Sequence, residues 1–287
     1  MGIVFFAAAA MSLLISALIL ISLFSNGLEF FTDVEWSTVF DSSSWAPRRE
    51  QFGITTILVG SLIVTGIAML VAAPLGLGAA IYLSEYARPS IRTVLKPILE
   101  VLAGIPSVVL GVFALNFIAP EVVGTFFGEE NGRGSMMAAG IGVGILTIPL
   151  VASVSEDAMR AVPNSLREAS AGVGARRMST TLRVVLPAAV SGIVAAIILG
   201  ASRAIGETMV VFIAGGASDS ANFTTDPFEG TLTMTAAMAS LAVGTDQVRG
   251  AALAVPSLYF VGIVLFALTL GLNVIANVFV RRVRQAY

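Results

Sequence analysis

Residues 163–187, PNSLREASAGVGARRMSTTLRVVLP, form a polar and basic segment between two long apolar runs. Ser165 and Glu168 have the spacing of a capping box, in which two side chains satisfy backbone amides at the start of a helix. Gly172 and Gly174 are then expected to end that helix, and a second basic segment leads to Pro187. The pattern predicts a helix–turn–helix elbow outside the membrane. A capped surface loop without a further role is the alternative.

Apolar runs long enough to cross a membrane flank this elbow. A spanning helix needs about 20 predominantly apolar residues, and six stretches qualify, at roughly 3–24, 53–83, 98–119, 135–155, 185–215 and 254–280. Only 12% of the residues are charged, against about 25% in soluble domains. The first stretch lacks a basic start and a good cleavage site, so we keep it as a helix. The sequence predicts an all-α integral membrane protein with six transmembrane helices in one domain, 1–287.

Charge orients the predicted bundle. With both termini in the cytoplasm, 11 of the 16 Lys and Arg residues fall in cytoplasmic segments, as the positive-inside rule demands. The outer segments hold twelve carboxylates and four cations. Trp36 and Trp45 lie in the first outer loop, where they could settle at the membrane interface, but two residues carry little weight. We therefore expect a multi-pass protein of the cell membrane with both termini inside.

Several kinds of chemistry are excluded. The chain has no cysteine and no histidine, so disulfides, thiolate or imidazole metal sites and Cys/His catalysis are impossible. A P-loop needs a lysine after a glycine-rich turn, yet the single lysine, Lys96, stands in RTVLKPIL. Asp219, Asp226 and Asp246 match no metal loop. We expect no enzyme activity, no metal and no cofactor on this chain, and a lipid rather than a nucleic-acid environment.

Two charged residues lie within the fifth predicted span, in ILGASRAIGETMVVFI, residues 198–213. Inserting an arginine at a helix centre costs about 2.5–3.5 kcal/mol, so Arg203 needs a reason. Glu207, four residues on, would share its helix face and could neutralise it as a structural ion pair. Alternatively the pair faces a water-accessible path, where the guanidinium would bind an oxyanion and Glu207 would keep binding weak enough for release. Thr208 could donate a hydroxyl there, or bond only to its own helix.

The third predicted span offers weaker candidates. The break at Gly104–Ser107 frees backbone groups, which membranes tolerate only where they are buried or line a cavity. Ser107 could therefore face the path, and a packing kink is the alternative. Glu100, near the inner end of this span, could gate the path or cap the helix. Residues 231–244 are too short to cross and are expected to be re-entrant or external.

The elbow also resembles a known motif. Its spacing is similar to the EAA loop of ABC-importer permeases, Glu-Ala-Ala-x3-Gly-x9-Ile-x-Leu-Pro, matched here by Glu168, Ala169, Gly174, Leu186 and Pro187. Serine and valine replace an alanine and the isoleucine. In that family the loop, here within 160–187, forms coupling helices that dock in a groove of the ATPase subunit.

The resemblance extends over most of the core, residues 50–285. Residues 81–111 and 202–210 are similar to permeases of the phosphate-specific ABC transporter, and the Gly-Glu-Thr-Met form resembles its C-type subunit. This resemblance implies a type I importer permease (MetI-like) fold and half of a phosphate pathway that contains Arg203 and Glu207. It also implies a second related permease of the A type, two ATP-binding subunits that hold ATP and Mg, and an external phosphate-binding protein.

Other functions are possible on this evidence. A permease for another oxyanion, such as sulfate or molybdate, would have a similar sequence. A regulatory membrane subunit that does not conduct would have no need of a buried Arg/Glu pair. An ion-driven carrier would leave the coupling loop unexplained.

Overall fold

The computed structural model describes residues 2–41, 43–128, 134–216, 220–243 and 252–283. Within these ranges six helical segments are long and apolar enough to cross a membrane: Gly2–Asp33, Ile54–Tyr86, Ser107–Phe127, Met136–Arg160, Arg177–Ile205 and Ala254–Val280. The predicted all-α class with six spans is therefore confirmed.

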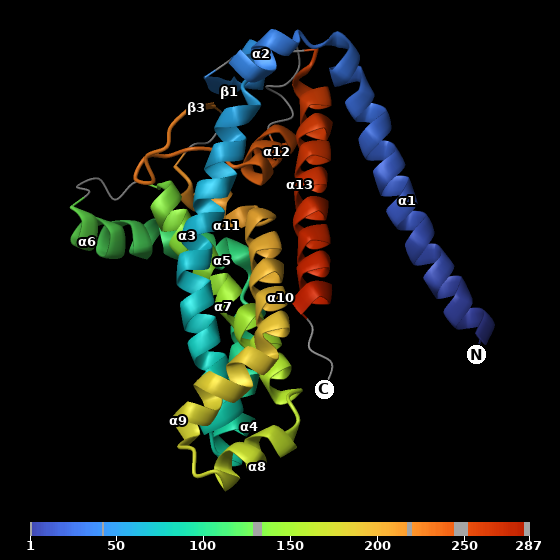
Figure 1. Ribbon diagram of the computed structural model, residues 1–287. Helices are drawn as coiled ribbons and strands as arrows, with labels where there is room; N and C mark the ends of the chain where they lie inside the picture. Colours follow the sequence, from blue (N-terminus) through green and yellow to red (C-terminus); the bar gives the residue numbers. More distant parts are fainter. Residues whose placement is uncertain (1, 42, 129–133, 217–219, 244–251, 284–287) are drawn as a thin grey trace.

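The molecule has two distinct ends (Figure 1). The end that we call the sheet end carries α2 (Trp36–Asp41) and a small antiparallel sheet in the order β2-β1-β3, formed by Gln51–Phe52, Ser44–Ala46 and Ala221–Asn222. The opposite end, the elbow end, carries α4 (Pro89–Ala103), α8 (Asn164–Gly172) and α9 (Arg177–Thr180). The N-terminal end of α1 (Gly2–Asp33) and the C-terminal end of α13 (Ala254–Val283) both point toward the elbow end.

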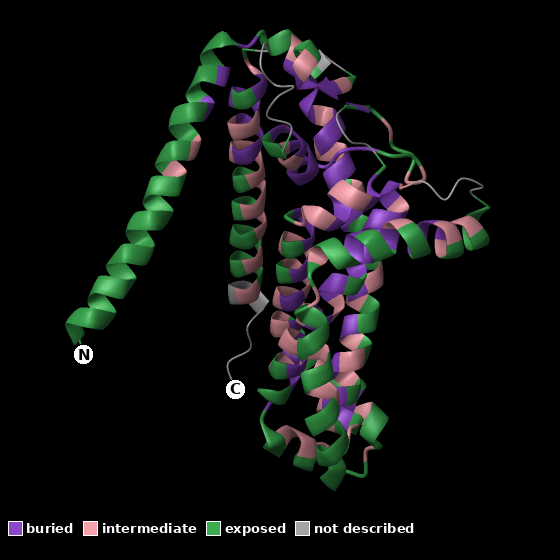
Figure 2. Ribbon diagram, turned by 180° about the vertical axis from the view of Figure 1, so that it is seen from behind, coloured by how far each residue is buried: buried purple, intermediate pink, exposed green. Residues whose placement is uncertain are grey.

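The centre of the bundle is the packing of α3 (Ile54–Ile81) against α7 (Met136–Arg160). Glycines make this approach close, as expected for helices in lipid. A Cβ on Gly140 would lie 2.7 Å from the side chain of Ile67, and a Cβ on Gly76 would lie 2.9 Å from that of Val151. The buried residues gather along this contact (Figure 2), so α3 and α7 form the frame on which the other helices are placed.

Gly144→Ala should therefore destabilise the protein. A Cβ at this position would lie 2.9 Å from the backbone oxygen of Ala68 and 2.8 Å from Val71, and overpacking of this kind costs about 1–3 kcal/mol. Gly78→Ala is the matched control, because a methyl group added at Gly78 would meet nothing within 4 Å. The midpoint of denaturation of the detergent-solubilised chain should fall for the first variant alone. Equal midpoints would show that α3 and α7 can shift apart to admit the methyl group with no loss of stability.

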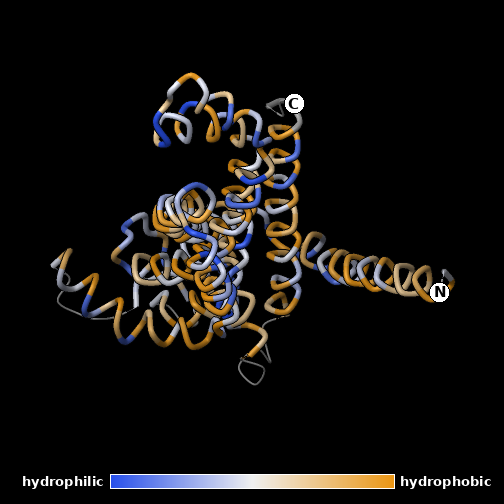
Figure 3. The backbone as a smooth tube through the Cα atoms, turned by 90° about the horizontal axis from the view of Figure 1, so that it is seen from below, coloured by the Kyte–Doolittle hydropathy of each residue, from blue (hydrophilic) through white to orange (hydrophobic). Residues whose placement is uncertain are grey.

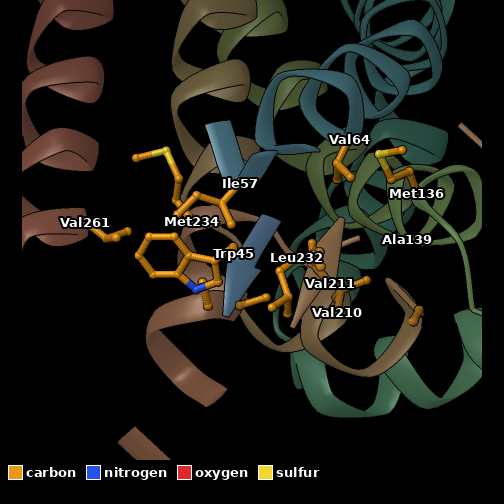
Figure 4. Close-up of a cluster of buried hydrophobic side chains, with 14 of the residues drawn as sticks. Trp45, Ile57, Val64, Met136, Ala139, Val210, Val211, Leu232, Met234 and Val261 are labelled. Atoms are coloured by element: carbon orange, nitrogen blue, oxygen red, sulfur yellow. The ribbon is translucent and has the colours of Figure 1, made fainter. Parts of the chain in front are cut away.

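A hydrophobic core lies near the sheet end (Figure 4). Trp45, on β1, is 0% exposed and lies beside Ile57 and Met234 in that view. Trp45 is therefore a core residue and does not settle at the membrane interface. The reason is that the face of β1 that carries Trp45 packs against the hydrophobic cluster that includes Ile57 and Met234.

The first helix is nearly separate from the bundle. It touches α13 near the sheet end, where Phe30 stacks on Phe260 with ring centroids 4.7 Å apart, and then diverges from it (Figure 1). None of the residues in its most apolar stretch is buried, and Figure 3 shows the helix as hydrophobic over most of its length. An exposed helix that is mostly apolar suits contact with lipid tails or with other apolar helices.

The third span begins later than the sequence indicates. Residues 98–103 belong to the amphipathic helix α4, which ends at Ala103, whereas the crossing segment consists of α5 (Ser107–Phe113), the π-helical turn region Ala114–Gly124 and α6 (Thr125–Phe127). Pro106 disfavours helical geometry in the residue before it, so the apolar run is divided into two helices. The predicted break at Gly104–Ser107 is therefore confirmed, whereas the predicted range 98–119 starts too early.

The fifth span is divided in a similar way. α9 continues through Thr181–Val185 into α10, which runs from Leu186 to Ile205. The chain then leaves helical geometry and resumes as the short helix α11, Met209–Ala214. The predicted continuous span 185–215 is therefore a long helix, a break at 206–208, and a short helix. The stretch 231–244 contains α12 (Met234–Val243), which is short and largely buried, as expected of a segment that does not cross.

The elbow itself is confirmed, with a different start. α8 ends at Gly172, and Gly174 has φ +80°, a left-handed conformation in which glycine is favoured. The capping box is absent, because Pro163 is the N-cap residue and no side chain caps the helix there. Ser165 already lies inside the first turn. A hydrogen bond of 2.9 Å between the hydroxyls of Ser170 and Thr180 joins α8 to α9.

Candidate functional site

Arg203 lines a cavity of about 180 Å³ between three helices. α4 contributes Lys96 and Glu100, α7 contributes Ser153 and Glu156, and Arg203 enters from the end of α10. The apolar part of the wall is Leu99, Ala103, Leu146, Pro149 and Leu150. Two cations and two carboxylates thus converge on one small space in a chain that is otherwise poor in charge. Convergent polar groups in an apolar cavity are typical of a binding site.

The end of α10 explains how the arginine is tolerated. Arg203 lies in the last turn of this helix and is exposed. The last four carbonyls of a helix have no intrahelical partner and carry the negative end of the macrodipole. A guanidinium is favoured at this position, so Arg203 does not need a carboxylate on its own helix.

The predicted neutralising pair between Arg203 and Glu207 does not form. Among the described residues no ion pair within 4.0 Å joins these two side chains. The helix ends at Ile205, so the four-residue spacing does not place both on one face. Instead, Oε1 of Glu207 accepts hydrogen bonds from the amides of Met209 and Val210, at 3.2 and 3.3 Å. Glu207 therefore stabilises the start of α11, where a carboxylate is favoured.

The other predicted path residues fall into two groups. Glu100 is exposed and shares the cavity with Arg203. Thr208 donates to the carbonyl of Gly206 at 3.4 Å, which fits a hydroxyl bonded to its own backbone. Ser107 is half-buried at the start of α5, and neither it nor Thr208 is among the residues that line the cavity.

Glu156 is the residue that the sequence analysis missed. It is 0% exposed, accepts a hydrogen bond of 3.0 Å from Nε of Arg92, and lies 3.3 Å from Nζ of Lys96. Its Oε1 also accepts a hydrogen bond from NH2 of Arg92 and forms an ion pair with it. The available signal was the four-residue spacing of Arg92 and Lys96, which places two cations on one face of α4, where a carboxylate on a neighbouring helix can pair with both.

The pKa of Lys96 reflects this arrangement. Burial alone would lower it, but the hydrogen bond to Asp157 and the charges of Glu156 and Asp157 outweigh burial and raise it above the ordinary lysine value. The stabilisation from a raised pKa is complete below the unfolded value and is lost as the pH rises through the folded value. The attachment of α4 to α7 by Lys96 is thus insensitive to pH near neutrality.

A second ionic contact fixes the elbow to the bundle. NH2 of Arg167, on α8, lies 2.9 Å from Oε1 of Glu85 and also donates to the carbonyl of Met159 at 2.8 Å. NH1 of Arg167 donates to the carbonyl of Val162 at 2.7 Å. Glu85 belongs to Tyr82–Tyr86, the π-helical end of the second span. One arginine therefore joins the elbow to the ends of the second and fourth spans.

Some residues of the EAA-like pattern are exposed at the surface, and others lie at the base of the elbow. Glu168, Ala169 and Gly174 are exposed, so they are presented to whatever lies beyond the elbow end. Leu186 is half-buried and packs on a small hydrophobic cluster that includes Met159, while Pro187 is exposed near the start of α10. The elbow thus has an exposed face and a base that packs on the bundle.

The break after α10 is also held from the sheet end. The hydroxyl of Thr235, on α12, donates to the carbonyl of Glu207 at 2.7 Å. The amide of Met234 donates to the hydroxyl of Ser61, on α3, at 2.9 Å. α12 is therefore bonded both to the frame of the bundle and to Glu207 within the break, a link that no spacing in the sequence indicated.

Acidic residues of the outer loops form no metal-binding group in the part of the chain that the structure describes. Oδ1 of Asp226 accepts the amide of Phe228 at 3.0 Å, which is a local turn. Asp219 and Asp246 lie outside the described residues.

Comparison with known proteins agrees with this architecture. Residues 72–285 match the family described as "Binding-protein-dependent transport system inner membrane component". The chain is 33% identical to the phosphate transport system permease protein PstC 1 of Mycobacterium tuberculosis, over 91% of this chain and 83% of that protein. It is 32% identical to PstC of Mesorhizobium japonicum, over 96% and 88%.

A solved structure supports the fold. A chain of a bacterial alginate ABC transporter, in complex with an alginate pentasaccharide-bound periplasmic protein, aligns with a TM-score of 0.65. The alignment covers 96% of this chain and 94% of that chain at 16% identity. The architecture is thus the MetI-like fold of ABC importer permeases. With this fold and with its similarity to PstC permeases, the chain is a permease component of an ABC importer and belongs to the family of binding-protein-dependent transport system inner membrane components.

Proposed function

We propose that this chain is a transmembrane subunit of an ATP-driven phosphate importer and forms half of the phosphate path. The observation that carries the proposal is the position of Arg203, exposed at a helix end in a cavity that also contains Lys96, Glu100 and Glu156. Its planar guanidinium suits phosphate oxygens and stays charged at any working pH. The nearby carboxylates lower the local positive charge, so the anion would bind weakly enough to be released.

The proposal includes an orientation and a set of partners. The elbow end is basic and would be cytoplasmic, with both termini on the same side. A second, related permease would complete the path, and two ATP-binding subunits would hold ATP and Mg²⁺ and dock on the exposed face of the elbow. An external phosphate-binding protein would deliver the anion at the sheet end. This protein is needed because the outer segments carry more carboxylates than cations and repel free anions within about 8 Å.

Uptake of radiolabelled phosphate into vesicles tests this function. The chain is co-reconstituted with its second permease, its ATPase and the external binding protein, and each component is omitted in turn. Uptake should require ATP and the binding protein. Excess unlabelled sulfate or molybdate should leave it unchanged. Competition by either oxyanion would identify a different substrate, and uptake without ATP would contradict an ABC mechanism.

Arg167→Gln should uncouple ATP hydrolysis from uptake. The change removes the ion pair with Glu85 and weakens the bonds to two carbonyls, so the elbow would move without the second span. A loss of about 1.4 kcal/mol in this coupling corresponds to about tenfold less uptake per ATP. Arg88→Gln is the control, an exposed arginine outside the elbow. The ratio of phosphate transported to ATP hydrolysed should fall for Arg167→Gln alone, and an unchanged ratio would refute the role of this contact.

A further inference from the structure

A second cavity lies at the elbow end, with a volume of about 600 Å³. Its wall includes four arginines, namely Arg92, Arg160, Arg167 and Arg177, and one carboxylate, that of Glu85. It shares no lining residue with the cavity of Arg203. Its volume lies in the range of about 300–1,000 Å³ that is typical of small-molecule sites.

Two of these arginines are already engaged. Arg167 binds Glu85, and Arg92 binds the buried Glu156. These pairs connect α8 to the second span and α4 to α7, so they are parts of the framework. Breaking them to bind a ligand would leave a buried carboxylate without its partner, which is costly.

The other two arginines are available. Arg160 approaches a carboxylate no closer than 3.9 Å, at Glu156, and its side chain is 54% exposed. Within the described part of the chain no carboxylate lies within 4.0 Å of Arg177. Its guanidinium stands 5.2 Å from the ring centroid of Tyr86, a cation–π contact that leaves its donors free to bind. Arg160 ends α7 and Arg177 begins α9.

We propose that this cavity is a second anion site that binds a phosphate group through Arg160 and Arg177. Two guanidiniums that are not engaged in framework pairs can neutralise a free phosphate dianion or the single charge of a lipid phosphodiester, and each presents donors in a plane that fits phosphate oxygens. The phosphate is free or part of an anionic lipid headgroup, since basic pockets at the ends of membrane helices bind such headgroups. The bound group joins α7 to α9 and so restrains the elbow. The site does not depend on the proposed substrate of the Arg203 cavity.

The first arm of the test measures free phosphate. Radiolabelled inorganic phosphate is equilibrated with the purified full-length chain in an uncharged detergent. In an Arg203→Gln background, which removes the proposed transport site, the double variant Arg160→Gln/Arg177→Gln should bind it about tenfold or more weakly, since the charged donors to the phosphate oxygens are lost. Arg183→Gln, another exposed arginine near the elbow end, should bind as the unchanged chain does. Arg203→Gln should retain this second site and lose only the proposed transport site.

The second arm measures lipid. The chain is placed in vesicles of phosphatidylcholine alone or mixed with phosphatidylglycerol, and the lipid that remains bound after extraction is quantified. Retention of phosphatidylglycerol that the double variant loses identifies the headgroup as the source, whereas loss in the first arm alone identifies free phosphate. Arg160→Lys/Arg177→Lys should keep part of the binding, which separates loss of charge from misfolding.

The proposal fails if the unchanged chain binds neither ligand, or if the double variant binds both as well as the unchanged chain. It also fails if the double variant loses only its association with the ATPase subunit. That result would show that an acidic segment of a partner chain occupies the cavity instead.

Discussion

Arg203→Gln should reduce phosphate uptake on the order of a hundredfold while the transporter still assembles. The variant removes a fixed charge and its fork of donors from the cavity that also contains Glu100. Hydrogen bonds to charged groups contribute about 1.5–3 kcal/mol each, and two of them account for a loss of this size. Uptake into vesicles at saturating binding protein and ATP measures it.

The same variant should leave stability almost unchanged. Arg203 is exposed, and no carboxylate lies within 4.0 Å of it in the described structure. Surface substitutions of this kind change stability by about 0.5 kcal/mol or less. Arg88→Gln, an exposed arginine outside the elbow, should change neither uptake nor the midpoint of denaturation. Normal uptake by Arg203→Gln would remove this residue from the path, and a large loss of stability would favour a structural role.

Arg203→Lys refines the interpretation. The lysine keeps a positive charge but presents a point charge instead of a planar fork. If charge alone matters, uptake by this variant should be close to that of the unchanged chain. If the guanidinium binds two phosphate oxygens at once, uptake by Arg203→Lys should lie between that of the unchanged chain and that of Arg203→Gln.

Glu156→Gln should destabilise the protein by about 3 kcal/mol, at the lower end of the range for breaking a buried ion pair. The lower end applies because Arg92 and Lys96 remain 22% and 32% exposed and can recover some hydration. α4 would then lose its attachment to α7. The midpoint of denaturation in detergent should fall, and the backbone amides of α4 should exchange hydrogen faster.

Asp157→Asn is the matched control for this change. Asp157 is adjacent in sequence and also contacts Lys96, at 3.3 Å, but its side chain is 65% exposed. Exposed ion pairs contribute about 0–1 kcal/mol, so this variant should differ little from the unchanged chain. Equal losses for both variants would mean that burial does not decide the strength of this network. An unchanged exchange rate in α4 would mean that other contacts hold the helix.

Much of the fold could be predicted from local properties of the sequence. The number of spans follows from the length of apolar runs, because the hydrocarbon thickness sets how many residues a helix needs. The end of α8 follows from Gly172 and Gly174, because the left-handed geometry of a helix end favours glycine. The importance of Arg203 also follows locally, since an arginine in an apolar run needs a stabilising environment.

The partners of the charged residues could be predicted much less well. The spacing of Arg203 and Glu207 predicted a pair, but the chain breaks after Ile205 and Glu207 caps α11 instead. The break is held by α12, since the hydroxyl of Thr235 donates to the carbonyl of Glu207 across 28 residues of sequence. The spacing of two residues predicts a shared helix face only if the helix continues through both of them.

Apolar run length and the placement of glycines thus determined six helices and an elbow, and the arginine in an apolar run singled out Arg203. Packing alone decided that Glu156 binds Arg92 across 64 positions of sequence, that Trp45 is buried, and that Glu100 rather than Glu207 shares a cavity with Arg203. The physical reason is the range of the interactions. Hydropathy and turn geometry act within a few residues, whereas burial and ion pairing depend on which helices meet.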